Sequence, residues 1–263
     1  MLSWQAAVME HARMSQPLRP GTVIITGGSR GIGAETVVLC AQAGYDVLFT
    51  YVANHERAAQ LVQRCADLPG RVQAMQADAR DTARAGEVLQ RALQLGRLAG
   101  LVNNVGITSR IGSFLDLDMA VARDVMEVNV IGLMALCQIC VRHWVEGGQR
   151  GSIVNLSSLA AASGAPHEYI HYAGSKGAVE AFTLGLAREF AARGIRANVV
   201  SPGTTETEIH ASSGEPGRAQ RVAARLPMQR VAQAQEVAQA VLWLLSQQAS
   251  YVSGTVLKVT GAA

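Results

Sequence analysis

The sequence has little lysine, few aromatic residues and a low content of charge. Only two lysines, Lys176 and Lys258, occur among its 263 residues, against 21 arginines. Charged residues make up 16% of the chain, whereas hydrophobic residues make up 49%. A chain with so many apolar and so few charged residues can bury a sizeable core, which excludes an intrinsically disordered protein.

Several classes of partner and site are disfavoured by the same inventory. The formal net charge is only +3 and the chain has no basic stretch, so we expect no nucleic-acid partner. No apolar run reaches the ~18 residues that a membrane span needs, so we expect no membrane association. Four cysteines in a chain of this length indicate free thiols in a reducing compartment, which predicts a cytoplasmic protein. Cys137 and Cys140 have the spacing of a metal pair but lie in an apolar segment without a second pair, so we expect no metal.

Strand-like and helix-like segments alternate from residue 22 onward. Short apolar runs at 22–26, 46–51, 71–77, 98–103, 151–157, 195–201 and 255–260 predict seven strands. Helical patterns at 31–43, 54–68, from about 81, and at 118–145, 171–193 and 235–246 separate most of them. This alternation predicts an α/β fold, a doubly wound seven-stranded parallel sheet of the Rossmann type flanked by helices.

Two segments fall outside this regular pattern. Residues 1–20 lack the continuous apolar stretch of a secretory signal, and we expect a flexible extension, with a translation start at Met14 as an alternative. Residues 202–227 are rich in Gly, Pro, Ser, Thr and Glu and are long for a connection, which is typical of a lid or binding loop.

A glycine-rich turn follows the first predicted strand. Gly27, Gly31 and Gly33 have the spacing Gly-x-x-x-Gly-x-Gly and directly precede a helix. Glycines let backbone N–H groups approach a phosphate closely, and the N-terminus of the helix adds positive potential. The turn, with Ser29, Arg30 and Ile32 inside it, therefore predicts a dinucleotide phosphate site.

Tyr172 and Lys176 are four residues apart, which places them on one face of a helix. A tyrosine phenol ionises near pH ~10. A neighbouring ammonium favours the phenolate and lowers that pKa, so we expect Tyr172 to donate and accept protons near neutral pH. A lone Tyr-x-x-x-Lys pair is more often a plain surface feature, and its interpretation depends on the other motifs.

Together these motifs resemble those of the short-chain dehydrogenase/reductase family. The glycine turn is followed in chain order by Asn103-Asn104-Val105-Gly106, Asn129, Ser158, Tyr172 with Lys176, and Pro202-Gly203 with Thr207. The resemblance covers about residues 21–261. It implies one NAD(P)-binding domain at 21–263 that transfers a hydride between nicotinamide and a carbonyl or secondary alcohol. Candidate substrates are 3-oxoacyl thioesters, sugars or polyols, and small ketones.

The resemblance also implies roles for the catalytic residues. Tyr172 is the general acid and base, and Lys176 lowers its pKa and binds the nicotinamide ribose. The usual family spacing places the substrate-binding serine at Leu159, which has no donor. One extra residue within 163–170 restores the role to Ser158, with Ser157 as the alternative.

Asn129 matches the asparagine that kinks the long helix of this family and holds a water for proton relay. The alternative is a core asparagine whose hydrogen bonds are satisfied within the protein.

The end of the second strand bears on the choice of cofactor. It reads Tyr51-Val52, without the acid that would bind the adenosine ribose, and Arg30 offers a guanidinium to a 2′-phosphate. We therefore expect NADP(H) in preference to NAD(H), with a solvated Arg30 as the alternative. The other cofactor contacts that we expect are at Tyr51, Asp78, Asn104, Gly106, Pro202, Gly203 and Thr207.

Two of these contacts have more specific expectations. The family acid at Asp78 binds the adenine amine, and its alternative role here is a helix cap shared with Asp81. Thr207 is expected at the nicotinamide carboxamide or at the phosphates.

The resemblance implies an oligomer and leaves one alternative function. We expect a homotetramer, or a homodimer, packed through the long helices and the last helix and strand. The chain ends Thr260-Gly261-Ala262-Ala263 instead of the acid-Gly-Gly pattern common in the family. A sensor or scaffold of the same fold that binds the nucleotide but turns over little is the alternative to an enzyme.

Overall fold

The computed structural model describes residues 20–207, 215 and 217–263. The predicted extension at 1–20 therefore lies outside the described residues except for Pro20, and so does the middle of the predicted loop, at 208–214.

Seven parallel strands form one sheet in the order β3-β2-β1-β4-β5-β6-β7. They are β1 (Thr22–Ile25), β2 (Asp46–Tyr51), β3 (Val72–Gln76), β4 (Leu98–Asn103), β5 (Gly151–Leu156), β6 (Ile195–Pro202) and β7 (Val256–Val259). The first strand, β1, lies in the middle of the sheet, and β2 and β3 follow it to one edge. The chain then crosses back to β4, and β5, β6 and β7 extend the sheet to the opposite edge. The predicted doubly wound α/β fold is thus confirmed. The reversal between β1 and β4 creates the crevice at which such sheets bind ligands.

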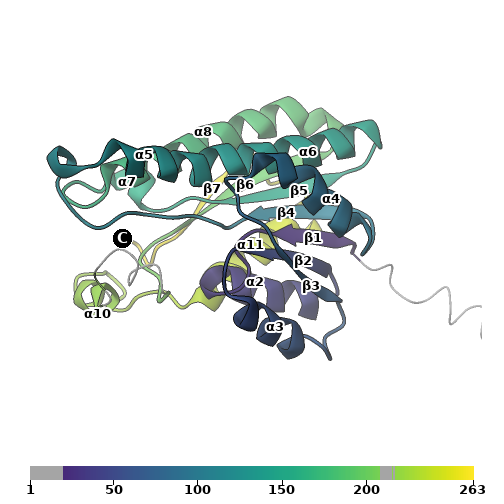
Figure 1. Cartoon of the computed structure of the whole chain (residues 1–263), viewed down its shortest axis with the longest axis horizontal. Helices are drawn as coiled ribbons and strands as arrows, with labels where there is room; N and C mark the ends of the chain where they lie inside the picture. The colour runs from purple at the N-terminus through teal and green to yellow at the C-terminus, as the bar shows by residue number, and fades with distance from the viewer. Residues whose placement is uncertain (1–19, 208–214, 216) are drawn as a thin grey trace, which may run out of the picture.

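Helices cover both faces of the sheet (Figure 1). One face carries α2 (Gly31–Gln42), α3 (His55–Arg64) and α11 (Ala234–Leu245), and the other carries α4 (Ala85–Leu93), α5 (Met119–Met126), α6 (Gly132–Glu146) and α8 (Ile170–Phe190). The short helical turns are η1 (Thr82–Arg84), η2 (Phe114–Asp116), α7 (Ala160–Ser163), η4 (Ala191–Arg193), α10 (Arg218–Ala223) and η5 (Gln247–Ala249). The sequence did not predict α7 or α10.

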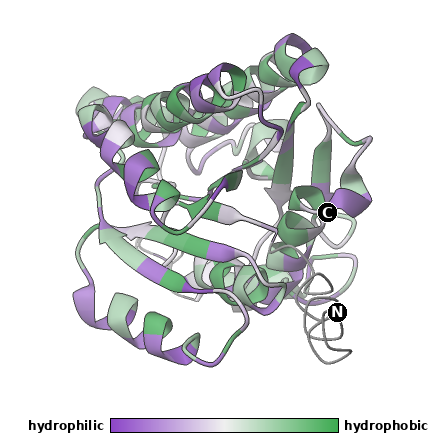
Figure 2. Ribbon diagram, turned by 90° about the vertical axis from the view of Figure 1, so that its right-hand side faces the viewer, coloured by the Kyte–Doolittle hydropathy of each residue, from purple (hydrophilic) through white to green (hydrophobic). Residues whose placement is uncertain are grey.

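Two apolar clusters, one on each face of the sheet, hold the layers together. Successive side chains of β1 point to opposite faces, so Val23 and Ile25 belong to one cluster and Ile24 to the other. Figure 2 shows that the central strands are mostly hydrophobic, whereas the outer helices alternate hydrophobic and hydrophilic residues. This pattern is the expected one for a sheet buried on both faces.

The helix predicted at 118–145 is continuous but not uniform. A π-helical turn, η3 (Glu127–Ile131), joins α5 to α6 and carries Asn129 at its centre. By length and composition this segment, Met119–Glu146, could cross a membrane, but 56% of its most apolar window is buried inside the protein. Packing within the fold therefore accounts for part of its apolar character, while Met119 and Ile131 remain exposed.

Gly151, the first residue of β5, tests how tightly the layers pack. A Cβ atom there would lie 2.4 Å from the ring of Trp144, which is fully buried and donates from Nε1 to the carbonyl of Leu98 at 3.0 Å. We expect Gly151→Ala to lower the free energy of unfolding by about 1–3 kcal/mol, measured by denaturant or thermal melts. The control, Gly86→Ala, adds a methyl group in α4 where no atom lies within 4 Å and should be neutral or slightly stabilising. Equal melting temperatures for the two variants would contradict this packing.

Candidate active site

The turn between β1 and α2 requires glycine at the predicted positions. Gly27 and Gly31 have left-handed backbones, with φ of +63° and +53°. A Cβ atom at Gly33 would lie 2.3 Å from the carbonyl oxygen of Gly27. Because the turn opens α2 at Gly31, it presents backbone N–H groups at a helix N-terminus, which is the geometry that binds phosphate.

Asn104, just after β4, holds this turn in shape. Its Nδ2 atom donates to the carbonyl oxygens of Thr26 and Gly27, both at 2.9 Å. In return, the hydroxyl of Thr26 accepts hydrogen bonds from the backbone N–H groups of Asn104 and Val105, each at 3.1 Å. The amide group of Asn104 thus supports the phosphate turn from the neighbouring strand.

The nucleotide end of the site lies at the carboxyl end of β2. Tyr51 ends the strand, and its hydroxyl is 2.9 Å from Nδ1 of His55, with the two rings edge to face. Asn54 caps α3 by accepting a hydrogen bond from the backbone N–H of Arg57 at 2.9 Å. Arg30, at the start of α2, and Arg57 line the same cavity. This end therefore combines two guanidinium groups with a strand end that carries no acid.

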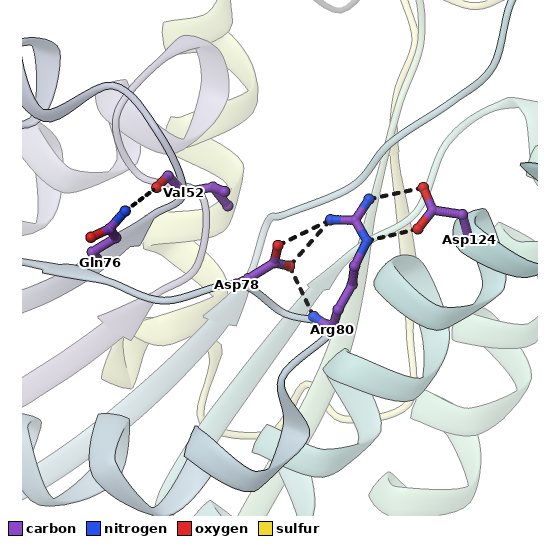
Figure 3. A network of polar contacts seen from close by, with 5 residues as sticks. All are labelled: Val52, Gln76, Asp78, Arg80 and Asp124. Atoms are coloured by element: carbon purple, nitrogen blue, oxygen red, sulfur yellow. Dashed lines mark hydrogen bonds and ion pairs between the residues drawn. The ribbon is translucent and has the colours of Figure 1, made fainter.

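Asp78 follows β3 and is tied into an ion-pair network (Figure 3). Its carboxylate accepts hydrogen bonds from the backbone N–H of Arg80 at 3.0 Å and from the Arg80 guanidinium at 3.2 Å. The same guanidinium donates to both carboxylate oxygens of Asp124 on α5, at 2.7 and 2.8 Å, and holds the pKa of Asp124 below its usual value. Since Arg80 is engaged by two carboxylates, it is a poorer phosphate ligand than its place in the cavity would indicate.

Tyr172 and Lys176 lie together in the first half of α8. The Lys176 ammonium donates to the carbonyl of Leu156 at 2.8 Å and lies 5.7 Å from the centre of the Tyr172 ring. Burial lowers the pKa of Lys176 to about 8. Burial also raises the pKa of Tyr172 to about 12, against a smaller lowering by a hydrogen bond with Ser158.

The expectation that Tyr172 has a lowered pKa is therefore wrong for the protein alone. The loss of hydration destabilises the phenolate more than the neighbouring groups stabilise it, so the pKa of Tyr172 rises. At neutral pH the phenol is protonated, which is the form that donates a proton.

The adjacent serines at the end of β5 contact different residues. Ser157 is buried and donates to Oε1 of Glu180 at 2.7 Å. Ser158 lines the cavity with Tyr172, whose pKa it lowers, and its hydroxyl accepts from the backbone N–H of Ala160 at 3.1 Å. This geometry favours Ser158 over Ser157 as the group beside the reacting oxygen.

The connection between α7 and α8 has an unusual backbone. Ala165 and His167 adopt left-handed conformations, with φ of +45° and +62°, a cost of roughly 1–2 kcal/mol for a residue with a Cβ atom. Both lie within 163–170, where the sequence analysis expected one extra residue. The connection ends at Tyr169, whose ring stands edge to face on Tyr172 at 5.3 Å between centroids. Tyr169 was predicted to have no role, yet its side chain lines the cavity.

Asn129 is fully buried, and its side chain is satisfied by protein groups. Its Oδ1 atom accepts from the N–H of Ile107 at 2.8 Å, and its Nδ2 atom donates to the Ile107 carbonyl at 2.9 Å and to the Ser175 hydroxyl at 3.0 Å. A Cβ atom at Gly106 would lie 3.1 Å from Nζ of Lys176 and 3.5 Å from Oδ1 of Asn129. These bonds satisfy the side chain within the protein beside Lys176, and the role of Asn129 in a proton relay stays a prediction.

The segment after β6 closes the cavity over the glycine turn. The carbonyl of Pro202 accepts from the N–H of Leu159 at 2.8 Å, and the N–H of Gly203 donates to Val259 at 2.9 Å. The methyl group of Thr207 would be 3.2 Å from a Cβ atom placed on Gly31. Of the two places expected for Thr207, the structure puts it at the phosphate turn.

One cavity of about 820 Å³ joins these groups. Every predicted site residue lines it except Gly33, which packs against the turn, and Asn129, which is buried behind it. It runs from Arg57 past the glycine turn to Tyr172. Cys137 and Cys140 are buried elsewhere, in α6, where burial raises the pKa of Cys137 to about 12. Within the described ranges no group of three His, Cys, Asp or Glu side chains is arranged to hold a metal ion.

Comparison with known proteins agrees with this geometry. The family model described as enoyl-(acyl carrier protein) reductase matches residues 27–261. The relative named uncharacterized oxidoreductase YgfF, from Escherichia coli strain K12, is 43% identical over 241 residues, which cover 90% of this chain and 98% of the relative. The chain belongs to the short-chain dehydrogenase/reductase family.

Further members of the family are similar along nearly their whole length. The 3-oxoacyl-[acyl-carrier-protein] reductase FabG of Thermotoga maritima is 35% identical, with 90% of this chain and 95% of the relative covered. A solved structure described as a short chain dehydrogenase/reductase family protein has a TM-score of 0.80 at 36% identity, covering 92% of this chain and 96% of the other. The protein is thus an oxidoreductase of alcohol or carbonyl groups, and its family implies a nicotinamide cofactor.

Proposed function

We propose that this short-chain dehydrogenase/reductase is an NADP(H)-dependent carbonyl reductase or alcohol dehydrogenase with Tyr172 as its general acid and base. One observation carries the proposal. The protonated Tyr172 phenol lies in one cavity with Ser158 and beside the buried ammonium of Lys176, and the same cavity includes the glycine turn. The cofactor supplies or accepts a hydride at nicotinamide C4, and the residues of this chain handle the proton.

In the direction of reduction, the Tyr172 hydroxyl would give its proton to the carbonyl oxygen as the bound nicotinamide reduces the carbonyl carbon and is itself oxidised. The products are an alcohol and a Tyr172 phenolate. Ser158 orients the oxygen by a hydrogen bond, and the Lys176 ammonium stabilises the phenolate. Asn129 retains its proposed place in the proton relay beside Lys176, while its side chain fixes the backbone of Ile107.

The preference for NADP(H) is supported by the nucleotide end of the cavity. β2 ends without a carboxylate that would bind ribose hydroxyls and repel a 2′-phosphate, and Arg30 and Arg57 line the cavity there. Tyr51, Asp78 and Thr207 complete the proposed cofactor contacts. The substrate remains a 3-oxoacyl thioester, a sugar or polyol, or a small ketone.

The assembly proposed for the enzyme is a homotetramer, or a homodimer, of single domains formed by residues 21–263. Large apolar side chains are exposed on the helices expected to pack between copies, among them Met119 and Ile131 on the α5–α6 segment and Trp243 on α11. We propose a cytoplasmic location, in keeping with four cysteines that are all buried as free thiols.

Replacing the proposed proton donor tests the reaction. We expect Tyr172→Phe to lower carbonyl reduction by about 100- to 10,000-fold, because it removes only the hydroxyl. Binding of NADPH, followed by nucleotide fluorescence, should stay within about twofold because the aromatic ring remains. The matched control, Tyr169→Phe, removes a hydroxyl from the same cavity wall and should retain most of the activity. Loss of NADPH binding together with turnover in Tyr172→Phe would contradict the assignment.

Replacing Arg30 tests the choice of cofactor. We expect Arg30→Ala to weaken NADPH binding by about 10- to 100-fold, the loss of one charge-assisted contact to phosphate, and to leave NADH binding nearly unchanged. Arg64→Ala is the control, since Arg64 pairs with Glu35 on the surface outside the cavity. Equal losses for the two nucleotides in Arg30→Ala would show that Arg30 does not bind a 2′-phosphate.

A further inference from the structure

Three consecutive residues at the carboxyl end of β5 each lie near a different residue of α8, two elements that lie side by side (Figure 1). The Leu156 carbonyl accepts from Lys176, the Ser157 hydroxyl donates to Glu180, and Ser158 lines the cavity with Tyr172, whose pKa it lowers. The partners on α8 are spaced four residues apart, so they share one face of the helix. The proposed reaction uses the first and the third of these pairs and leaves the second without a role.

The middle pair is a strong hydrogen bond at a buried position. Ser157 is 4% exposed, and its hydroxyl donates to a carboxylate oxygen of Glu180 at 2.7 Å, whereas the Lys176 carbonyl is farther away, at 3.3 Å. A hydroxyl has one proton, so the closer, charged acceptor receives it. The backbone N–H of Ser157 donates to Val200 on β6 at 2.8 Å. Ser157 thus joins the sheet to α8 through both its backbone and its side chain.

Ser158 follows this anchor directly, and the next residue, Leu159, still donates from its backbone N–H to Pro202 of β6 at 2.8 Å. The Ser158 hydroxyl accepts from the N–H of Ala160 at 3.1 Å in a local turn, and Ser158 lines the cavity with Tyr172. The Ser157–Glu180 bond, together with the Leu156–Lys176 bond, joins the strand end to α8 next to Ser158 and Tyr172. Loss of the Ser157–Glu180 bond would leave α8 held here by the Leu156–Lys176 bond and would let the separation of Ser158 from Tyr172 change.

We propose that Ser157 and Glu180 form a positioning pair that holds Ser158 and Tyr172 in register for proton transfer to the substrate oxygen. The pair touches neither substrate nor cofactor and acts through its neighbours. The inference rests on the proposed function in one respect, that Ser158 and Tyr172 act on the carbonyl group.

Four variants of the full-length enzyme test the pair. Glu180→Leu removes the acceptor, Ser157→Ala removes the donor, and the double variant removes both. Glu180→Gln keeps an oxygen that accepts the bond and removes only the charge. Glu189→Leu, at an exposed position of the same helix, is the matched control for the loss of a carboxylate.

Kinetics should separate positioning from simple support of the fold. We expect Glu180→Leu and Ser157→Ala each to lower kcat by about tenfold, with NADPH affinity within about twofold of the wild type. The double variant should be no worse than either single variant, since both remove the same bond. Glu180→Gln should recover most of the lost kcat, and Glu189→Leu should match the wild type. An unchanged kcat in Glu180→Leu, a Gln variant as impaired as Leu, or a joint fall of kcat and NADPH affinity would overturn the proposal.

A crystal structure of Glu180→Leu tests the pair without relying on turnover. We expect the distance between the Ser158 and Tyr172 hydroxyl groups to change in this variant and to keep its wild-type value in Glu180→Gln. An unchanged distance in Glu180→Leu would refute the positioning role. A wild-type enzyme that reduces no carbonyl would count against the proposed function, while this structural comparison would still decide the role of the pair.

Discussion

The burial of the Lys176 amino group is the constraint on which the site depends. The residue is 3% exposed, and its ammonium donates to the carbonyl of Leu156 at the end of β5. Burying a cation is costly unless polar groups compensate for lost water, and here the cost appears as a pKa lowered to about 8. The residues around the amino group fit this placement. Gly106 has no side chain and leaves room for the Lys176 amino group, and the Tyr172 ring lies next to that amino group.

The two ends of the cavity are built by different means. At the nucleotide end, backbone geometry dominates: left-handed glycines shape the turn, and the Asn104 side chain holds it against β4. At the reaction end, side chains from β5 and α8 meet in register, so the sheet and one long helix determine the chemistry together. The crevice between β1 and β4 brings these ends into one cavity, which explains how a single sheet can bind a dinucleotide and a small substrate side by side.

The fold and the glycine turn could be predicted because they depend on local patterns of sequence: apolar periodicity, β-branched runs and glycine spacing. Shifts in pKa and hydrogen bonds between distant residues could not be predicted, because they depend on burial and on long-range contacts. The sequence shows Lys176 four residues after Tyr172, but it does not show that burial raises the pKa of Tyr172 more than its neighbours lower it. The Ser157–Glu180 bond joins residues 23 positions apart and depends on how α8 lies on β5. One signal was available for Glu180, since it lies four residues after Lys176 on the same helical face.

The need for a buried Lys176 ammonium can be tested by the pH dependence of carbonyl reduction with NADPH bound, measured in single turnovers. Since the pKa of Lys176 is lowered from 10.5 to about 8, its ammonium is present below that pH and is lost above it. Tyr172, with a pKa of about 12, stays protonated throughout this range. We expect a constant rate up to pH about 8 and a decline above it as the phenolate loses its stabilising cation. A rate that stays constant until the ordinary lysine pKa of 10.5 would contradict the lowered pKa of Lys176 and the cost of burial from which it follows.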